Sequence, residues 1–434
     1  MKYFVPLFLV SLQATANFSY KGEIGLRGKQ YPDDQRSITR DYQLDIKTKF
    51  ESNYEVESYR LHLGFFSRAD QNDSNRNIIN FDETYFSQNL PNFSYSVGSH
   101  IFNWSIMEVF RPIDTINAKN FDSNGDQIER LGQPSIILKK DFDESYFELI
   151  LFLTAQKSII PTSSNRNGAA ISLSGNELTN IKEPRYVNSS SETSSNSKDI
   201  EYVIHYKHSF DNLELDIHFA NKYDTNNPLF SISTPKNTSP TLNSLEVTPF
   251  FLKYNQYGIA LQTNYSDYIF KIESTYNDYS DDTVELFLPP NFQTHISRED
   301  FSLSTFGLER SYSYSNGSNG VVFIEFQKVL NTSNEVARVL TPFQRDLAVF
   351  YRHSFNDFYS NQVILGFITD LDQGNERIYS ISIERRLFQS WKAKVDIRVI
   401  EADSNPKNLD LTSFQGLKGI ANSDSVALEL VKFF

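Results

Sequence analysis

Apolar and polar residues alternate along most of this chain. Between residues 38 and 50 the apolar positions share one parity, and the ionic positions Asp41, Asp45, Lys47 and Lys49 share the other. Successive side chains of a β-strand point to opposite faces, so the pattern predicts a strand with one apolar and one ionic face. The alternation recurs to the end of the chain in segments of about ten residues, which suit tilted strands that cross a lipid bilayer.

The connections between these segments alternate between short and long. Turns are expected near Asn53, Pro91, Asp211, Asp267, Asn356 and Ser390, and the longer polar stretches are Ala69–Asn77, Thr154–Lys198, Lys222–Ser244, Ser280–Glu299 and Ala402–Ser423. Short periplasmic turns and long extracellular loops are typical of a transmembrane antiparallel up-and-down β-barrel. We predict an all-β barrel of about 18 strands with both termini in the periplasm. This count assigns Thr248–Gln256 to a loop edge and includes a faint strand at Ser135–Lys140, and sixteen strands also fits.

Composition excludes a helical membrane protein but not a barrel. The mean hydropathy is −0.44 and the net charge is −13, and no run approaches the ~20 apolar residues of a spanning helix. Aromatic residues nevertheless reach 14%. Strands that face lipid on one side and water on the other, diluted by polar loops, give this average. Several soluble β-sandwich domains are the alternative, but the chain has no linker between different patterns and no fixed repeat length.

The first residues are typical of a secretory signal peptide. Lys2 provides a positive charge, Tyr3–Leu12 an apolar stretch, and Ala14-Thr15-Ala16 a cleavage site. We therefore expect residues 1–16 to be removed and residues 17–434 to form a single barrel domain. The sequence contains no cysteine, which excludes a disulfide framework and thiolate chemistry.

The last segment predicts the cellular location. Val426, Leu428 and Leu430 share one parity, and the chain ends at Phe433-Phe434. An aromatic C-terminus on an alternating strand resembles the signal that the outer-membrane assembly machinery recognises. We expect the outer membrane of a Gram-negative bacterium, with this machinery, outer-membrane lipid and lipopolysaccharide as partners. A homo-oligomer and a monomer both fit, and the sequence predicts neither nucleic-acid binding nor a cofactor.

A set of short motifs extends over most of the chain. Between Val97 and Pro134 they are Phe102-Asn103-Trp104, Glu108, Asp114, Ile116-Asn117, Glu129 and Leu131-Gly132-Gln133-Pro134, and later ones are Gln256-Tyr257-Gly258, Lys271-Ile272-Glu273, Thr341-Pro342-Phe343, Asp346, Asn356-Asp357, Asp370-Leu371-Asp372 and Arg385-Arg386. In this order they resemble a family of uncharacterised, porin-like outer-membrane barrels of proteobacteria. Ser105 departs from the family pattern, which usually has Gly after the Trp, and Ser158–Asp199 matches poorly. The resemblance implies an outer-membrane barrel and implies no substrate.

The segment Ser105–Gln133 is the candidate functional insert. It joins two strands, yet it mixes ionisable residues with apolar ones such as Val109 and Phe110. A loop that faced only water would not need the apolar residues. A loop folded into the lumen would pack them on the wall and present its charges to the pore. The candidate constriction residues are Glu108, Arg111, Asp114, Asp126 and Glu129, and a loop packed on the surface is the alternative.

The polar face of the strands is the candidate pore wall. Strand parity directs these basic residues inward: Lys47, Lys49, Arg60, Arg352, Arg386 and Arg398. Acidic residues such as Glu273 and Glu325 share this face, so the two signs nearly balance and the net charge does not predict cation selectivity. The alternative is a network of ion pairs that only stiffens the barrel.

We expect a passive or weakly selective channel for small hydrophilic solutes. The sequence shows no catalytic cluster, so an enzyme is not expected. Asp122 and Asp126 have the spacing that begins an EF-hand loop, but Gln127 and Gln133 replace the required Gly and Glu, so no metal site is predicted. A structural or assembly barrel, or a conduit for polysaccharide export, is the alternative function. An open lumen favours the channel, and a lumen filled by Ser105–Gln133 favours the structural role.

Overall fold

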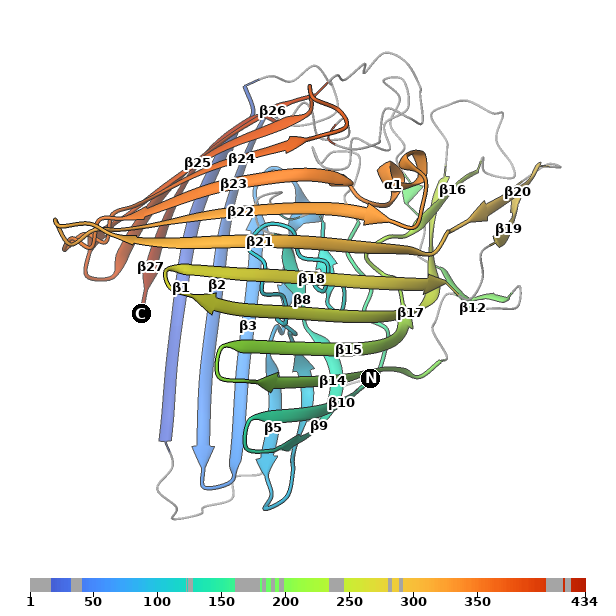
Figure 1. Ribbon diagram of the computed structural model, residues 1–434, viewed down its shortest axis with the longest axis horizontal. Helices are drawn as coiled ribbons and strands as arrows, with labels where there is room; N and C mark the ends of the chain where they lie inside the picture. The colour runs from blue at the N-terminus through green and yellow to red at the C-terminus, as the bar shows by residue number, and fades with distance from the viewer. Residues whose placement is uncertain are drawn as a thin grey trace.

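The computed structural model is a closed antiparallel β-barrel of 18 strands (Figure 1). It describes residues 17–32, 41–121, 123, 128–160, 180–181, 185–188, 192–194, 199–233, 246–279, 283–288, 292–402, 417 and 423–434. The signal peptide predicted at residues 1–16 lies outside this set.

The wall strands follow one another around the barrel in chain order. They are β1 (Asn17–Gln30), β2 (Tyr42–Val56), β3 (Tyr59–Asp70), β5 (Thr84–Asn89), β6 (Ser94–His100), β9 (Gln133–Asp141), β10 (Ser145–Phe152), β14 (Glu201–Ser209), β15 (Leu213–Tyr223), β17 (Glu246–Tyr265), β18 (Tyr268–Tyr279), β21 (Phe301–Ser313), β22 (Asn319–Leu330), β23 (Arg345–Ser354), β24 (Gln362–Asp370), β25 (Arg377–Phe388), β26 (Trp391–Glu401) and β27 (Ser425–Phe433). The last strand pairs with the first, from Glu23 with Phe433 to Gln30 with Val426. This pairing closes the sheet, and the predicted fold class and number of strands are confirmed. The faint strand at Ser135–Lys140 lies within β9.

Shorter elements lie beside the wall strands or in the connections between them. β4 (Ile78–Asn80) pairs with β3 above β5, and β7 (Ala118–Asn120) pairs with β8 (Glu129–Leu131). The remaining elements lie in the long connections: η1 (Ser74–Arg76), β11 (Asn180–Ile181), β12 (Arg185–Asn188), β13 (Glu192–Ser194), β16 (Leu229–Ser233), β19 (Thr283–Leu288), β20 (Phe292–Ser297) and α1 (Asn334–Leu340). Within the described ranges, no helix has the length and apolar character needed to cross a membrane.

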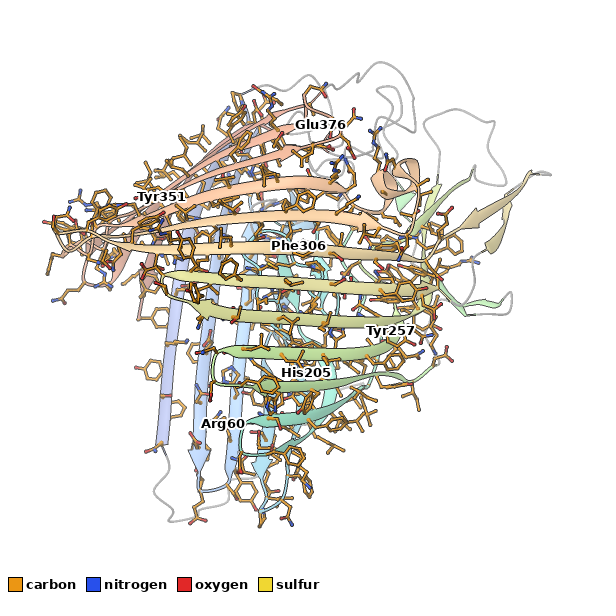
Figure 2. All side chains as sticks on the ribbon, in the orientation of Figure 1. Arg60, His205, Tyr257, Phe306, Tyr351 and Glu376 are labelled. Carbon is orange, nitrogen blue, oxygen red and sulfur yellow. The ribbon has the colours of Figure 1, made fainter. Side chains whose placement is uncertain are left out.

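The alternation along each strand gives the barrel two different faces. Tyr257 and Phe306, labelled in Figure 2, belong to the outward set and are 49% and 53% exposed. Inward neighbours are polar and buried, for example Gln256 and Thr305, which are both fully covered. An apolar outer face is what lipid requires, and a polar inner face is what a water-filled interior requires.

Short and long connections lie at opposite ends of the barrel, here named the turn end and the loop end. The turn predicted near Asn53 is wrong. Asn53 lies inside β2, where it pairs with Ser19 of β1 and His62 of β3, and the turn follows at Glu57 and Ser58. The strand continues because Tyr54 and Val56 extend its apolar stripe.

The assignment of Thr248–Gln256 to a loop edge is also wrong. These residues belong to β17, which runs for 20 residues from Glu246 to Tyr265. Near Phe250, β17 leaves the wall and pairs with β16 on one side and β12 on the other. Phe250 and Phe251 are both buried, although they point to opposite faces. Because loop elements cover both faces here, the alternation that marks a lipid-facing strand is lost.

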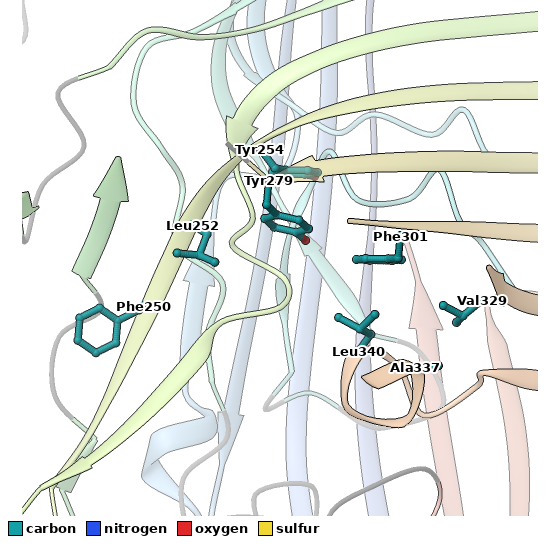
Figure 3. Packing of buried hydrophobic residues seen from close by; sticks show 8 residues of the cluster. All are labelled: Phe250, Leu252, Tyr254, Tyr279, Phe301, Val329, Ala337 and Leu340. Carbon is teal, nitrogen blue, oxygen red and sulfur yellow. The ribbon is translucent and has the colours of Figure 1, made fainter. Parts of the chain in front are cut away.

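An apolar cluster lies at the loop end beside this extension (Figure 3). It joins residues of β17, β18, β21 and β22 to α1, and its buried members are Phe250, Leu252, Tyr254, Tyr279, Phe301, Val329, Ala337 and Leu340. Tyr254 stacks on Tyr279 with ring centroids 5.5 Å apart. The cluster fixes one side of the loop end as a rigid rim.

A basic side chain should destabilise the barrel on its outer face and be tolerated on its inner face. Ile381 is outward and 40% exposed near the middle of β25, and its neighbour Ser382 points inward opposite Asp396. Ile381→Arg should lower the free energy of unfolding by ~2–4 kcal/mol, the usual cost of a basic side chain at the bilayer midplane. Ser382→Arg should change it by less than about 1 kcal/mol, because lumen substitutions are tolerated. Urea unfolding in lipid vesicles measures both, and equal losses would contradict the assignment of the faces.

Candidate functional site

The connection between β6 and β9, residues 101–132 and here named the lumen segment, lies inside the barrel. Its described residues contact inward side chains of strands from β3 to β26. The residues Asp122 and 124–127, including the predicted constriction residue Asp126, lie outside the described set. The segment is largely irregular, so its backbone needs hydrogen-bond partners other than a neighbouring strand.

Two inward glutamates of the wall supply these partners. Glu325 of β22 accepts hydrogen bonds from the backbone N–H groups of Glu108, Val109 and Phe110, at 2.6, 3.0 and 2.8 Å. Successive N–H groups that point to one anion form a concave anion site, here filled by a carboxylate of the same chain. Charge-assisted bonds of this kind are roughly twice as strong as neutral ones.

Glu273 of β18 binds the segment on both sides of this contact. One of its oxygens accepts from the N–H groups of Ile106 and Met107, and the other accepts a longer bond of 3.5 Å from Ile113. The residue is fully buried. The two glutamates therefore hold residues 106–113 against β18 and β22.

Apolar side chains fasten the same stretch to the wall. Met107, Phe110 and Ile113 are each at most 2% exposed. Phe110 packs in a cluster with Ala348 of β23, Ile368 of β24, Ile378 of β25 and Ile400 of β26. Met107 lies over Gly307 of β21, where a Cβ atom would stand 2.9 Å from its Sδ. These contacts spread the anchor over five strands, β21 and β23–β26.

Trp104 anchors the start of the segment on β14. Its ring stacks on the buried His205 at 4.1 Å with an interplanar angle of 17°. The imidazole of His205 in turn hydrogen bonds to Glu148 of β10 and Asp216 of β15, both at 2.9 Å. Two carboxylates therefore orient the ring on which Trp104 rests.

The later part of the segment returns along β17 and β15. Thr115 donates to Gln256, and Lys222 donates to the carbonyl oxygens of Thr115 and Ile116 at 3.1 and 2.9 Å. Asn226 donates to the carbonyls of Thr115 and Asn117. The segment thus reaches β22–β26, opposite the strands from which it starts, and then folds back to β17 and β15.

Two predicted constriction residues are used in ion pairs that fix the segment. Asp114 accepts a bidentate pair of hydrogen bonds from Arg130, at 3.1 and 3.0 Å, and lies 3.7 Å from the Lys119 ammonium. Burial would raise the pKa of the Asp114 carboxyl, but Lys119 and Arg130 outweigh it and lower this pKa below its ordinary value. Glu129 is paired with the buried Arg68 of β3 and accepts from Asn120. Asp114 thus links two parts of the segment, Glu129 links the segment to β3, and neither carboxylate is a free pore charge.

Glu108 and Arg111 differ from these two residues. The Glu108 side chain is 46% exposed, and its carboxylate lies 3.8 Å from the Lys271 ammonium of β18. Arg111 donates through Nε to the carbonyl of Met107. Of the predicted constriction residues that the structure describes, Glu108 has the most accessible carboxylate.

The predicted wall residues lie on strands next to one another around the closure of the barrel. Lys47 pairs with Glu429 at 3.3 Å, Lys49 with Glu51 at 3.0 Å, and Arg60 with Glu55 at 3.1 Å. Arg352 lies over the ring of Phe323, Arg386 is exposed, and Arg398 is half-buried. The first three residues fit the ion-pair network that was the alternative, although the Lys49 side chain remains 46% exposed.

Sequence reasoning missed what Glu273, Glu325 and His205 do. Parity placed the two glutamates on the inner face, where a basic partner was the natural expectation. Their main partners are backbone N–H groups far away in the sequence, and no local pattern signals such contacts. The one available signal was that Ser105–Gln133 needed acceptors if it folded inward.

Comparisons with known proteins give the fold. No family model matches the chain, and no curated protein matches it. Wzi of Escherichia coli, described as an outer membrane protein involved in group 1 capsule assembly and a carbohydrate-binding β-barrel, is 10% identical, with 96% of this chain and 84% of Wzi covered and a TM-score of 0.50. OccAB1 of Acinetobacter baumannii is 8% identical, with 97% and 98% covered and a TM-score of 0.51.

These similarities establish a shared barrel fold and leave activity open. The resemblance to the uncharacterised porin-like family stays a prediction, because no family model supports it.

The glutamate contacts predict how the lumen segment is held. Glu325→Gln should speed hydrogen exchange of the amides of Glu108, Val109 and Phe110, because it removes the charge that strengthens their bonds. Glu429→Gln is the matched control, since Glu429 faces inward but pairs with Lys47 of β2. Exchange measured by mass spectrometry on the peptide that spans residues 106–113 tests this. Unchanged exchange in Glu325→Gln would contradict the proposed anchoring.

Proposed function

We propose that this protein is an outer-membrane channel for small hydrophilic solutes, in which the lumen segment forms the constriction. The observation that carries the proposal is the course of the segment. It runs from its start between β6 and β9 to the inner face of β18–β26, where Glu325 and Glu273 hold it, and it returns past β17 and β15, so that it narrows the passage. A segment fastened in this way has one fixed position, as a constriction needs.

The wall around the closure of the barrel supports an accessible passage. Its inward charges include Lys49 and Lys392, whose side chains are 46% and 36% exposed. Exposed ammonium groups on the inner face of a closed barrel must meet water in the lumen. The proposal includes an outer-membrane location with the turn end in the periplasm, contact of the outer face with lipid and lipopolysaccharide, and recognition of the last strand by the assembly machinery.

A carbohydrate-binding or polysaccharide-export role is the second candidate. Its support is the fold shared with Wzi, which is described as a carbohydrate-binding β-barrel. Carbohydrate binding without ion conduction would favour this candidate over the channel.

Planar-bilayer recordings of the refolded barrel test the channel directly. We expect stable ohmic steps from the wild type. Glu273→Gln combined with Glu325→Gln should give larger or noisier steps, because the segment then leaves its fixed position. Lack of conductance from a correctly folded barrel, recognised by its shifted gel mobility before heating, would reject the channel.

The exposed carboxylate of Glu108 predicts an effect on selectivity. Under a salt gradient, Glu108→Gln should shift the reversal potential toward anions, because it removes a negative charge from the narrow region. Asp143→Asn is the control, since Asp143 is exposed in the turn between β9 and β10 and bulk salt screens it within about 10 Å. Equal shifts in the two variants would contradict the place of Glu108 in the constriction.

A further inference from the structure

A pair of buried carboxylates faces the lumen at the loop end of β23 and β24. Asp346 and Asp370 are register partners on adjacent strands, so their side chains lie on the same face next to each other. They are 0% and 1% exposed. Like charges directly opposite each other destabilise a sheet, so this arrangement needs a compensating partner.

Among the side chains that the structure describes, the charged groups with the largest effect on Asp346 are Asp370, Glu376 and Asp372, and all of them are acidic. Arg345, the basic neighbour in sequence, forms its ion pair with Asp372 at 2.7 Å, and its side chain is 46% exposed. A buried carboxylate without a compensating cation costs several kcal/mol.

Two buried oxygen atoms at this place also have no hydrogen-bond partner. They are Oδ1 of Asp346 and Oε1 of Gln344, and Gln344 is 4% exposed. The amide nitrogen of Gln344 donates to Oδ2 of Asp370, which fixes the orientation of the amide beside the pair. The other oxygen of Asp370 accepts from the N–H groups of Asp372 and Gln373. Buried oxygens without donors indicate a ligand that accepts electron pairs.

We propose that a divalent cation of the calcium type binds between Asp346 and Asp370, with Oε1 of Gln344 as a further ligand. Calcium binds carboxylate and amide oxygens and takes water at its remaining positions. In the described part of the chain no group of three or more His, Cys, Asp or Glu side chains could hold a metal ion, so this site has only two carboxylate ligands and needs Gln344 and water for the rest. Glu376 is 2% exposed and adds negative charge nearby. Figure 2, in which Glu376 is labelled, places it at the loop end of β25.

The cation would support the anchor of the lumen segment. Ala348 and Ile368, which pack against Phe110, are the next inward residues after Asp346 and Asp370 on the same two strands. A bound ion would hold β23 and β24 together one layer above Phe110. The site does not depend on solute passage, so its test is independent of conductance.

Calcium titration of the refolded full-length barrel, after treatment with EDTA, tests the site. Isothermal titration calorimetry with Ca²⁺ should detect one site in the ~10⁻⁴–10⁻³ M range typical of extracellular calcium modules. Asp346→Asn should weaken it at least about tenfold. Asp372→Asn is the control, because Asp372 belongs to the same loop but pairs with the exposed Arg345, and it should retain the site.

Thermal unfolding gives a second readout. In EDTA, Asp346→Asn should unfold at a higher temperature than the wild type, because the repulsion from Asp370 is gone. In Ca²⁺ the order should reverse, since only the wild type gains stability from the ion. Equal calcium binding by wild type and Asp346→Asn, or a wild type that neither binds nor responds to Ca²⁺ at 10 mM, would overturn the proposal in favour of a carboxyl pair that shares a proton.

Discussion

Closure of the sheet is the constraint on which the rest of this structure depends. Lipid offers no hydrogen bonds, so every backbone group of a spanning strand must be paired within the sheet. The pairing of β27 with β1 removes the last free edges. Closure also creates an inside and an outside, and the outside must be apolar along its whole circumference. Polar strand residues such as Gln256, Glu273 and Glu325 therefore point into the lumen, where they can bind the segment that lies there.

The lumen segment uses those partners in place of a strand. An irregular backbone inside a barrel would leave N–H groups without acceptors, at a cost of about 1–3 kcal/mol each. Glu273 and Glu325 remove most of this cost for residues 106–113, and Phe110 adds apolar contacts with the wall. Asp114 pairs with Arg130 inside the segment, and Glu129 pairs with Arg68 of β3. Of the predicted constriction carboxylates, Asp114 and Glu129 therefore fix the segment in place, and Glu108 faces the solvent.

The sequence predicts the architecture well because a period of two is a local signal. Alternation between Tyr42 and Phe50, or between Tyr379 and Ile383, needs no knowledge of the neighbouring strand. Prediction fails where that period is hidden. In β17, Phe250 and Phe251 are covered on both faces by loop elements, so the strand does not look amphipathic. At Asn53 a turn-forming residue stands in the middle of β2, because its position is fixed by pairing with β1 and β3.

The sequence predicts which segment folds into the lumen, but it does not predict which wall residues that segment contacts. Apolar residues among charges in Ser105–Gln133 indicated an inward fold, since such residues need a wall to pack on. The two glutamates that hold residues 106–113 lie more than 100 residues away, as Glu325 does from Val109, so only the folded barrel identifies them. The same holds for the Asp346 and Asp370 pair, which only the register of β23 and β24 brings together.

The most direct test of the account is a cross-link between the lumen segment and the wall. The sequence has no cysteine, so an introduced pair is the only one that can form a disulfide. Met107→Cys with Gly307→Cys should cross-link in the folded barrel, because the Met107 side chain lies over Gly307. Met107→Cys with Phe306→Cys should not, because Phe306 points outward. A disulfide in the first pair alone, detected by mass spectrometry, agrees with a segment docked in the lumen. Failure of the first pair, or equal cross-linking of both, would contradict it.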